Sequence, residues 1–184
     1  MIIGLVGYAQ SGKDTVANIL VEQHGFERRA FADKIRDFVY ELNPTIKLGY
    51  DTTTNVQLMV DQFGWDKAKQ EPKIRELLQG IGVAARNNIH DKVWINAALT
   101  NMQPNKRYVI TDVRFSNEIY ALKDLGAEIW RIERPGVGPV NNHVSEKELE
   151  GFSTDRSLLN VGTLDELTEL VKLRLDSYLA NQNN

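Results

Sequence analysis

A chain of 184 residues, 42% of them hydrophobic, has the size of one globular domain and can bury a core of its own. Its 22 Lys and Arg residues against 25 Asp and Glu give a net charge of -3, which excludes a general attraction to nucleic acid or to an anionic membrane. The sequence has no cysteine, which excludes disulfides, thiolate metal ligands and thiol nucleophiles and is typical of a reducing cytoplasm.

The first apolar run is too short for an export signal or a membrane anchor. It extends from Met1 to Val6 and stops at Gly7, whereas a spanning helix needs roughly 20 apolar residues. Its nearly continuous apolar character predicts a central strand of a parallel sheet over 2–6, covered on both faces. We therefore expect a cytoplasmic protein with neither a membrane nor a nucleic acid as partner.

The segment GYAQSGKDT after this strand carries the spacing G-x-x-x-x-G-K, and a helix over 13–24 with Gly25 as its stop follows directly. Glycines permit a tight turn with inward N–H groups, and the helix N-terminus adds positive potential, so a polyphosphate can be held there. Lys13 adds a full charge near the β- and γ-phosphates. A Gly-rich surface turn is the structural alternative. The predicted nucleotide-binding residues are Gly7, Ala9, Gln10, Ser11, Gly12, Lys13, Asp14 and Thr15.

Asp14 stands where Ser or Thr usually follows the lysine, and a hydroxyl comes one position later at Thr15. The displaced hydroxyl argues against a GTPase. Asp14 either complements the dipole of the helix or lies near a metal ion.

The next part of the chain predicts a strand over 26–32 and then a helix with Asp33 as its N-cap, which ends before Pro44. From about 54 to 102 the pattern is helical, with breaks near Gly64 and around 87–91, and no strand is predicted there.

A strand over 108–110 leads into Thr111, Asp112, Val113 and Arg114. An acidic residue at the end of a strand beside the phosphate loop predicts a carboxylate that fixes magnesium, with Arg114 aimed at phosphate. A simple turn residue is the alternative for Asp112. Ser116 is predicted to cap the following helix.

The last third predicts a strand over 127–132, a polar and mobile flap over 136–156, and a short strand over 158–161. Thr163 and Glu166 form a capping box for a final helix to about Leu179. Strands that alternate with helices indicate an α/β fold with a mainly parallel sheet.

Five segments resemble the phage-type deoxynucleoside monophosphate kinases, relatives of adenylate kinase and dephospho-coenzyme A kinase in the P-loop superfamily. They are GYAQSGKDT (7–15), FADKIR (31–36), TDVRFSNE (111–118), HVSE (143–146) and NVGTLDEL (160–167). The resemblance implies a single domain with a five-stranded parallel core flanked by helices (1–50, 104–135, 157–180). It also implies a helical acceptor-binding insertion at about 51–103 and a lid at about 136–156.

The same resemblance implies ATP and Mg²⁺ as cofactors and assigns roles around them. Lys13 and the loop amides would hold the ATP phosphates, and Thr15 and Asp112 the metal ion. Asp33 and Arg36 would approach the acceptor nucleotide, although Lys34 stands where proline is common.

Further candidates come from the helical middle and from the end of the chain. Arg75 and Arg86 could grip the acceptor phosphate and Trp94 could stack on a base; a solvated surface and a packed core are the alternatives. Arg131 and Arg134 flank the lid, and only one of them is expected to point inward, because residues three apart on a strand face opposite sides. Arg134 is preferred because it adjoins the lid.

Asn160 and Gly162 either line the adenine pocket or form a turn and helix cap. His143, Ser145 and Glu146 form no catalytic triad with a second base, which argues against a hydrolase. His24 and His90 are isolated and are interpreted as structural or exposed.

The predicted reaction is the ATP-dependent phosphorylation of a deoxynucleoside monophosphate to the diphosphate, in the host cytoplasm if the chain is phage-encoded. A dephospho-coenzyme A kinase or another small-molecule P-loop kinase is the alternative, and a nucleotide-dependent switch without turnover is a second one. The expected partners are the small-molecule substrates, and a homodimer is left open.

Overall fold

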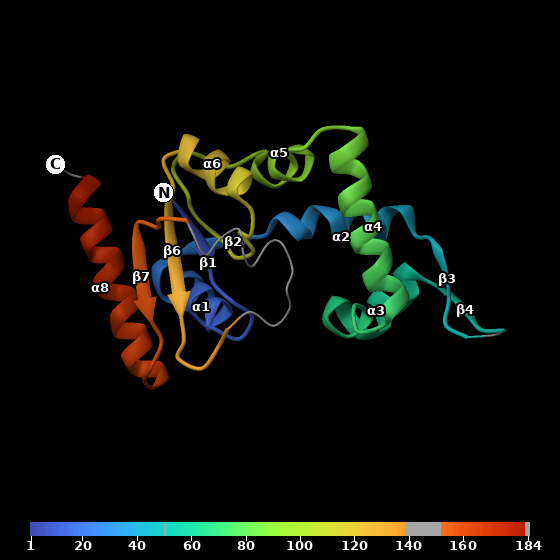
Figure 1. The fold of residues 1–184 in the computed structure, drawn as a ribbon, viewed down its shortest axis with the longest axis horizontal. Coiled ribbons are helices and arrows are strands. Elements are labelled where there is room, and N and C mark those ends of the chain that lie inside the picture. The colour runs from blue at the N-terminus through green and yellow to red at the C-terminus, as the bar shows by residue number, and fades with distance from the viewer. Residues whose placement is uncertain (50, 139–151, 183–184) are drawn as a thin grey trace. The chain divides into compact units, whose positions relative to one another are not determined.

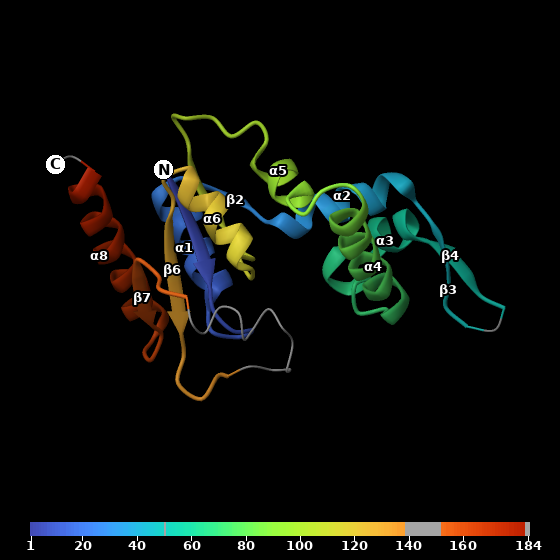
Figure 2. The same ribbon diagram turned by 45° about the horizontal axis from the view of Figure 1, so that its top comes forward.

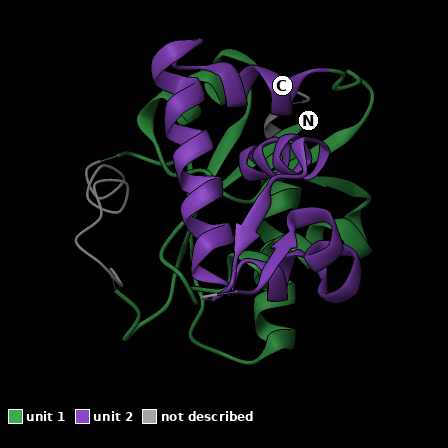
Figure 3. Cartoon of the chain, turned by 90° about the vertical axis from the view of Figure 1, so that its right-hand side faces the viewer, with its two compact units in different colours: residues 1–30, 101–184 green, residues 31–100 purple. Residues whose placement is uncertain are grey.

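The computed structural model describes residues 1–49, 51–138 and 152–182. Contacts divide the chain into two compact units, which are coloured in Figure 3. Unit 1 comprises Met1–Ala30 and Asn101–Asn184, and unit 2 comprises Phe31–Thr100. Most of the predicted flap, including His143, Ser145 and Glu146, lies outside the described residues.

Unit 1 is built on a five-stranded sheet in which every neighbouring pair is parallel. The strand order is β2-β5-β1-β6-β7. The strands are β1 (Ile2–Val6), β2 (Phe26–Arg29), β5 (Arg107–Ile110), β6 (Glu128–Glu133) and β7 (Arg156–Leu159). The predicted α/β fold with a five-stranded parallel sheet is therefore confirmed. The apolar run at the N-terminus forms the central strand, which explains why four of its five residues are buried.

Helices cover both faces of this sheet. On one face Ile3, Leu5 and Trp130 pack with α1 (Lys13–His24) and α8 (Leu164–Gln182). On the other face α6 (Ser116–Asp124) lies so close that a Cβ on Gly4 would be 2.9 Å from Leu122 Cδ1. Figures 1 and 2 both show α8 alongside β7.

Of the predicted helix ends in unit 1, the end of α1 is confirmed and the cap of α6 is not. The helix over 13–24 ends at Gly25, which is left-handed with φ 69° and donates its N–H to the Leu20 carbonyl. The prediction that Ser116 caps α6 is wrong, because Ser116 is already helical. The buried carboxylate of Glu118 caps this helix instead, accepting from the N–H groups of Arg114 (2.7 Å) and Phe115 (3.1 Å).

The described residues of unit 2 form four helices and a hairpin. They are α2 (Phe31–Leu42), β3 (Thr45–Lys47), β4 (Thr53–Asn55), α3 (Val56–Ala68), α4 (Pro72–Asn88) and α5 (Val93–Leu99). Val39, Ile46 and Ile74 belong to its own apolar core. The predicted break at Gly64 is confirmed, since its φ of 73° and ψ of 162° interrupt α3.

Two predictions for unit 2 are wrong. Asp33 lies in the first turn of α2 and is not its N-cap, because the helix begins at Phe31 and the preceding strand ends at Arg29. The antiparallel hairpin of β3 and β4, visible beside the helices of this unit in Figures 1 and 2, was not predicted. None of the helices in the described ranges has the length and apolar character that a bilayer crossing would demand.

Candidate active site

The turn between β1 and α1 has the backbone of a tight phosphate loop. Gly7 (φ 147°), Gln10 (φ 66°) and Gly12 (φ 103°) all have positive φ angles, and the Ser11 N–H donates to the Tyr8 carbonyl at 3.2 Å. A Cβ on Gly7 would lie 2.4 Å from the Ile132 carbonyl oxygen of β6. Glycine is thus required at both ends of the motif, for conformation and for space.

Lys13 bridges the two ends of this loop. Its ammonium donates to the carbonyl oxygens of Gly7 at 2.7 Å and Tyr8 at 2.6 Å, although it belongs to the first turn of α1. The loop thereby carries a fixed positive charge next to the helix N-terminus. Asp14 is exposed in the same first turn, where an acidic side chain complements the helix dipole.

The residues after β5 leave the sheet beside the phosphate loop. β5 is the parallel neighbour of β1, with Gly4 opposite Ile110, so both strands end at the same edge. Thr111 is buried and donates its N–H to the Arg29 carbonyl at 3.1 Å, which fixes the start of the turn. Asp112 is half-buried and Arg114 exposed. This edge is where ligands of open α/β sheets bind.

The role of Glu118 in this turn was not predicted from the sequence. Its carboxylate holds the N–H groups of Arg114 and Phe115 and so fixes the backbone just after Asp112. The available signal was an acidic residue at the third position of a helix, which is the usual place of the carboxylate in a capping box.

Asn160 is brought directly against the phosphate loop. Its side-chain amide donates to the Ser11 carbonyl at 3.0 Å, and its own N–H donates to the Glu133 carbonyl at 2.7 Å. Gly162 lies in the turn before α8, where a Cβ would be 2.1 Å from Glu166 Oε2 of the capping box. Asn160 therefore contacts the phosphate loop, whereas Gly162 lies against the capping box of α8.

The two arginines before the predicted flap differ in their surroundings. Arg131 lies in β6 opposite Val6 and donates to the Phe152 carbonyl at 2.8 Å. The Phe152 ring stands edge-on to Tyr120 of α6, with 5.5 Å between ring centroids. Arg134 is exposed directly after β6.

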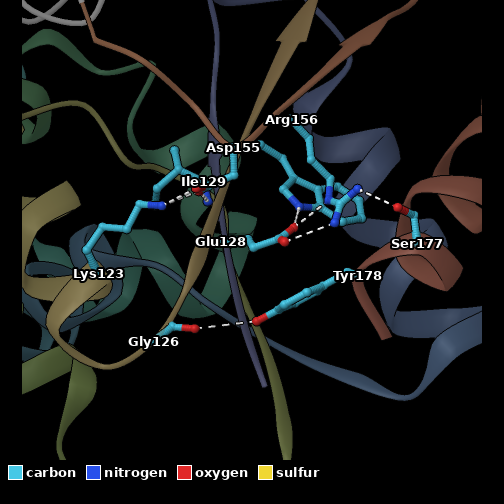
Figure 4. A network of polar contacts seen from close by, with 9 residues as sticks. Lys123, Gly126, Glu128, Ile129, Asp155, Arg156, Ser177 and Tyr178 are labelled. Atoms are coloured by element: carbon cyan, nitrogen blue, oxygen red, sulfur yellow. Dashed lines mark hydrogen bonds and ion pairs between the residues drawn. The ribbon is translucent and has the colours of Figure 1, made fainter. Parts of the chain in front are cut away.

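A polar network connects β6, β7 and α8 at the N-terminal ends of the two strands, away from the phosphate loop (Figure 4). Arg156 makes two hydrogen bonds to the Glu128 carboxylate, at 2.6 and 3.0 Å, and a third to Ser177 at 3.0 Å. The hydrogen bond from Glu128 raises the pKa of Arg156, and burial raises the pKa of Tyr178 beside it. Asp155 accepts from Lys123 and from the Ile129 N–H, so the chain enters β7 at a fixed register.

The remaining predicted site residues belong to unit 2. Arg36 and Asp33 form an ion pair of 2.8 Å on α2. Arg75 is exposed, with a long contact of 3.4 Å to the Lys69 carbonyl, and Arg86 is half-buried. Trp94 is buried in this unit, where its indole N–H donates to the Gly82 carbonyl at 3.0 Å and its ring meets Phe38 edge-on.

Deoxynucleotide monophosphate kinases are among the known proteins that this chain resembles. The sequence model of the family "Deoxynucleotide monophosphate kinase" matches residues 50–171. A protein of Acanthamoeba polyphaga mimivirus, provisionally named a deoxynucleotide monophosphate kinase, is 32% identical over 177 residues, which cover 90% of this chain and 91% of that protein.

A deoxynucleotide monophosphate kinase of Escherichia phage RB69 is 28% identical over 100 residues, which cover 51% of this chain and 41% of the phage protein. Among solved structures, a shikimate kinase from Aquifex aeolicus aligns over 97% of this chain and 98% of its own, with 13% identity and a TM-score of 0.48.

Proposed function

We propose that this chain, which belongs to the deoxynucleotide monophosphate kinase family, transfers the γ-phosphoryl group of ATP to a deoxynucleoside monophosphate. An oxygen of the acceptor phosphate attacks the γ-phosphorus, the bond to the β,γ-bridging oxygen breaks, and ADP leaves with the electron pair. The observation that carries the proposal is a phosphate loop with Lys13 at the junction of β1 and α1 in a member of this family.

The phosphate loop supports the donor side of the reaction. Its glycines have the positive φ angles of a tight phosphate-binding turn, and Lys13 sets a full charge against the loop carbonyls. Negative charge spreads over the transferring phosphoryl group in the transition state, and fixed donors and cations stabilise it without reorganising. Lys13 would therefore act on the transition state as well as on bound ATP.

The donor atoms beside the loop fit a magnesium ion. Mg²⁺ prefers oxygen ligands and is usually held by one or two carboxylates together with substrate phosphates and water. Thr15 and Asp112 offer one hydroxyl and one carboxylate at the same edge of the sheet. When bound, the ion would neutralise charge on the β- and γ-phosphates.

The acceptor side needs cations more than it needs a base, because a phosphate monoester is already an anion and a nucleophile. We assign this part to the arginines of unit 2, Arg36, Arg75 and Arg86, with Asp33 and Trp94 toward the nucleoside. Arg114 and Arg134, both exposed beside the phosphate-loop edge, would face the transferring group. A planar guanidinium matches phosphate geometry with two parallel hydrogen bonds.

The test is ATP consumption with a panel of acceptors, namely dTMP, dGMP, dCMP, AMP and dephospho-coenzyme A. Turnover with one or more of the deoxynucleotides is expected. In the cell, we infer that the reaction takes place in the reducing cytoplasm, which suits a sequence without cysteine. Activity confined to dephospho-coenzyme A would overturn the substrate assignment.

Lys13→Met tests the donor side with a side chain of similar length and no charge. We expect turnover to fall by about a hundredfold or more, since transition-state stabilisation by a fixed cation is lost. Lys172→Met, an exposed change on α8, is the matched control. Equal activity of the Lys13 variant and the wild type would remove the phosphate loop from the mechanism.

A further inference from the structure

The contact between Asn160 and the phosphate loop joins segments that are 149 positions apart in the chain. The Asn160 backbone is itself fixed, because its N–H donates to Glu133 at the end of β6. The side chain therefore reaches the loop from a rigid point between the ends of two strands.

The fit at this contact is close on both sides. A Cβ on Gly12 would lie 2.4 Å from the Asn160 amide nitrogen, and Ser11 is only 1% exposed. The residue after the buried serine must be glycine for the amide to approach. The glycine of the motif therefore also makes room for Asn160.

The hydrogen bond fixes one peptide group of the loop. A trans peptide places its carbonyl and its N–H on opposite sides. Since the Ser11 carbonyl is turned toward Asn160, the N–H of Gly12, which belongs to the same peptide, points away from it. Among the residues that the structure describes, none accepts a hydrogen bond from this N–H. Such an N–H at a helix N-terminus is a donor for an anion.

We propose that Asn160 is a positioning residue for the phosphate loop. Its amide holds the Ser11 carbonyl and thereby orients the Ser11–Gly12 peptide, so that the Gly12 N–H faces the phosphates of the nucleotide. This inference rests on the proposed function, and it differs from a place for Asn160 in the adenine pocket. If the side chain acts on the loop, it affects the binding of a polyphosphate that has no adenine at all.

The experiment compares ATP with inorganic tripolyphosphate, both with Mg²⁺, by isothermal titration calorimetry. The variants are Asn160→Ala and the isosteric Asn160→Asp, with Asn105→Ala, an exposed change in the loop before β5, as the matched control. We expect Asn160→Ala to weaken both ligands by the same factor, about five- to tenfold, as for one lost hydrogen bond. Asn160→Asp should weaken both further, because a carboxylate cannot donate to the Ser11 carbonyl and repels phosphate.

The kinetic readout should agree with the binding data. The KM for ATP should rise in both Asn160 variants while the KM for the acceptor stays unchanged, which a general loss of folding would not produce. If Asn160→Ala does not fold, Asn160→Asp decides, because it keeps the volume of the side chain.

Two outcomes would overturn the inference. Weaker ATP binding with unchanged tripolyphosphate binding would assign Asn160 to the adenine pocket, and unchanged binding of both would remove it from the site. Failure of the wild-type protein to bind either ligand would instead contradict the proposed function.

Discussion

At the scale of single residues, Gly12 meets two demands at once. Its φ of 103° belongs to a region that residues with a Cβ rarely adopt, and the space beside its Cα is taken by the Asn160 amide. Lys13 follows immediately and is held over the loop by two carbonyls. The spacing of glycines and lysine in the sequence was enough to predict this loop, because the motif itself encodes the backbone conformation.

Gly12→Ala should destabilise the protein by about 1–3 kcal/mol, because it strains the backbone and pushes against Asn160. It should also abolish detectable ATP binding at concentrations that saturate the wild type. Gly80→Ala is the control, since Gly80 lies inside α4 with nothing within 4 Å of an added Cβ. The control should stabilise by about 0.5–1 kcal/mol. Urea unfolding and calorimetry measure both effects, and similar results for the two variants would contradict the assigned role of Gly12.

At the level of helices and strands, the capping box of α8 was predicted from two residues, Thr163 and Glu166, and it is present as a pair of hydrogen bonds. The Thr163 N–H donates to Glu166 Oε2 at 2.7 Å, and the Glu166 N–H donates to the Thr163 hydroxyl at 3.3 Å. The hydrogen bond from the Thr163 N–H lowers the pKa of the exposed Glu166 carboxyl from its ordinary value. A local sequence signal is sufficient here because every partner lies within four residues.

The pH dependence of this cap follows from the lowered pKa. The carboxylate contributes stability that is fully present above its ordinary pKa in the unfolded chain and is lost as the pH falls through the lower pKa of the folded state. Glu166→Gln should therefore melt below the wild type at pH 7, and the gap should close in acid. Thermal melting between pH 3 and pH 7 measures it. Glu169→Gln, an exposed change on the same helix, should show no such gap, and a Glu166 gap that persisted at pH 3 would contradict the charge-based explanation.

The elements that sequence analysis missed lack such local signals. The strands of the hairpin read Thr45-Ile46-Lys47 and Thr53-Thr54-Asn55, which are too short and polar for a clear alternation. Ile46 alone is buried among them, against the helices of unit 2. Packing that distant segments provide, rather than the strands' own pattern, explains this hairpin.

At the scale of the whole molecule, the predicted site residues divide between the two compact units. The phosphate loop, Asp112 and Asn160 belong to unit 1, whereas Arg75 and Trp94 belong to unit 2. Unit 2 also includes α2, which packs against α4 and α5. The contact of Asn160 with Ser11 could not be predicted, because no pattern in the sequence links positions so far apart.

The acceptor role proposed for the arginines of unit 2 predicts that their variants act on the acceptor alone. Arg75→Ala should raise the KM for the deoxynucleotide about tenfold and leave the KM for ATP unchanged, if the guanidinium binds the acceptor phosphate. Lys73→Ala is the control on the same helix, where Lys73 pairs with Glu76 at 2.9 Å. Steady-state kinetics with each substrate varied in turn measures both constants. An unchanged KM for the acceptor would show that Arg75 does not bind the acceptor phosphate and is only a solvated surface residue of α4.

The central place of β1 in the sheet also has a consequence for the order in which the protein folds. Both of its neighbours come much later in the chain, since Ile2 pairs with Tyr108 and Ile3 with Glu128. On the ribosome β1 must wait until β5 (Arg107–Ile110) has been synthesised before it gains a partner. Pairing between such remote segments slows folding and leaves an apolar strand open to aggregation meanwhile. The nascent chain is therefore most vulnerable before β5 has been synthesised.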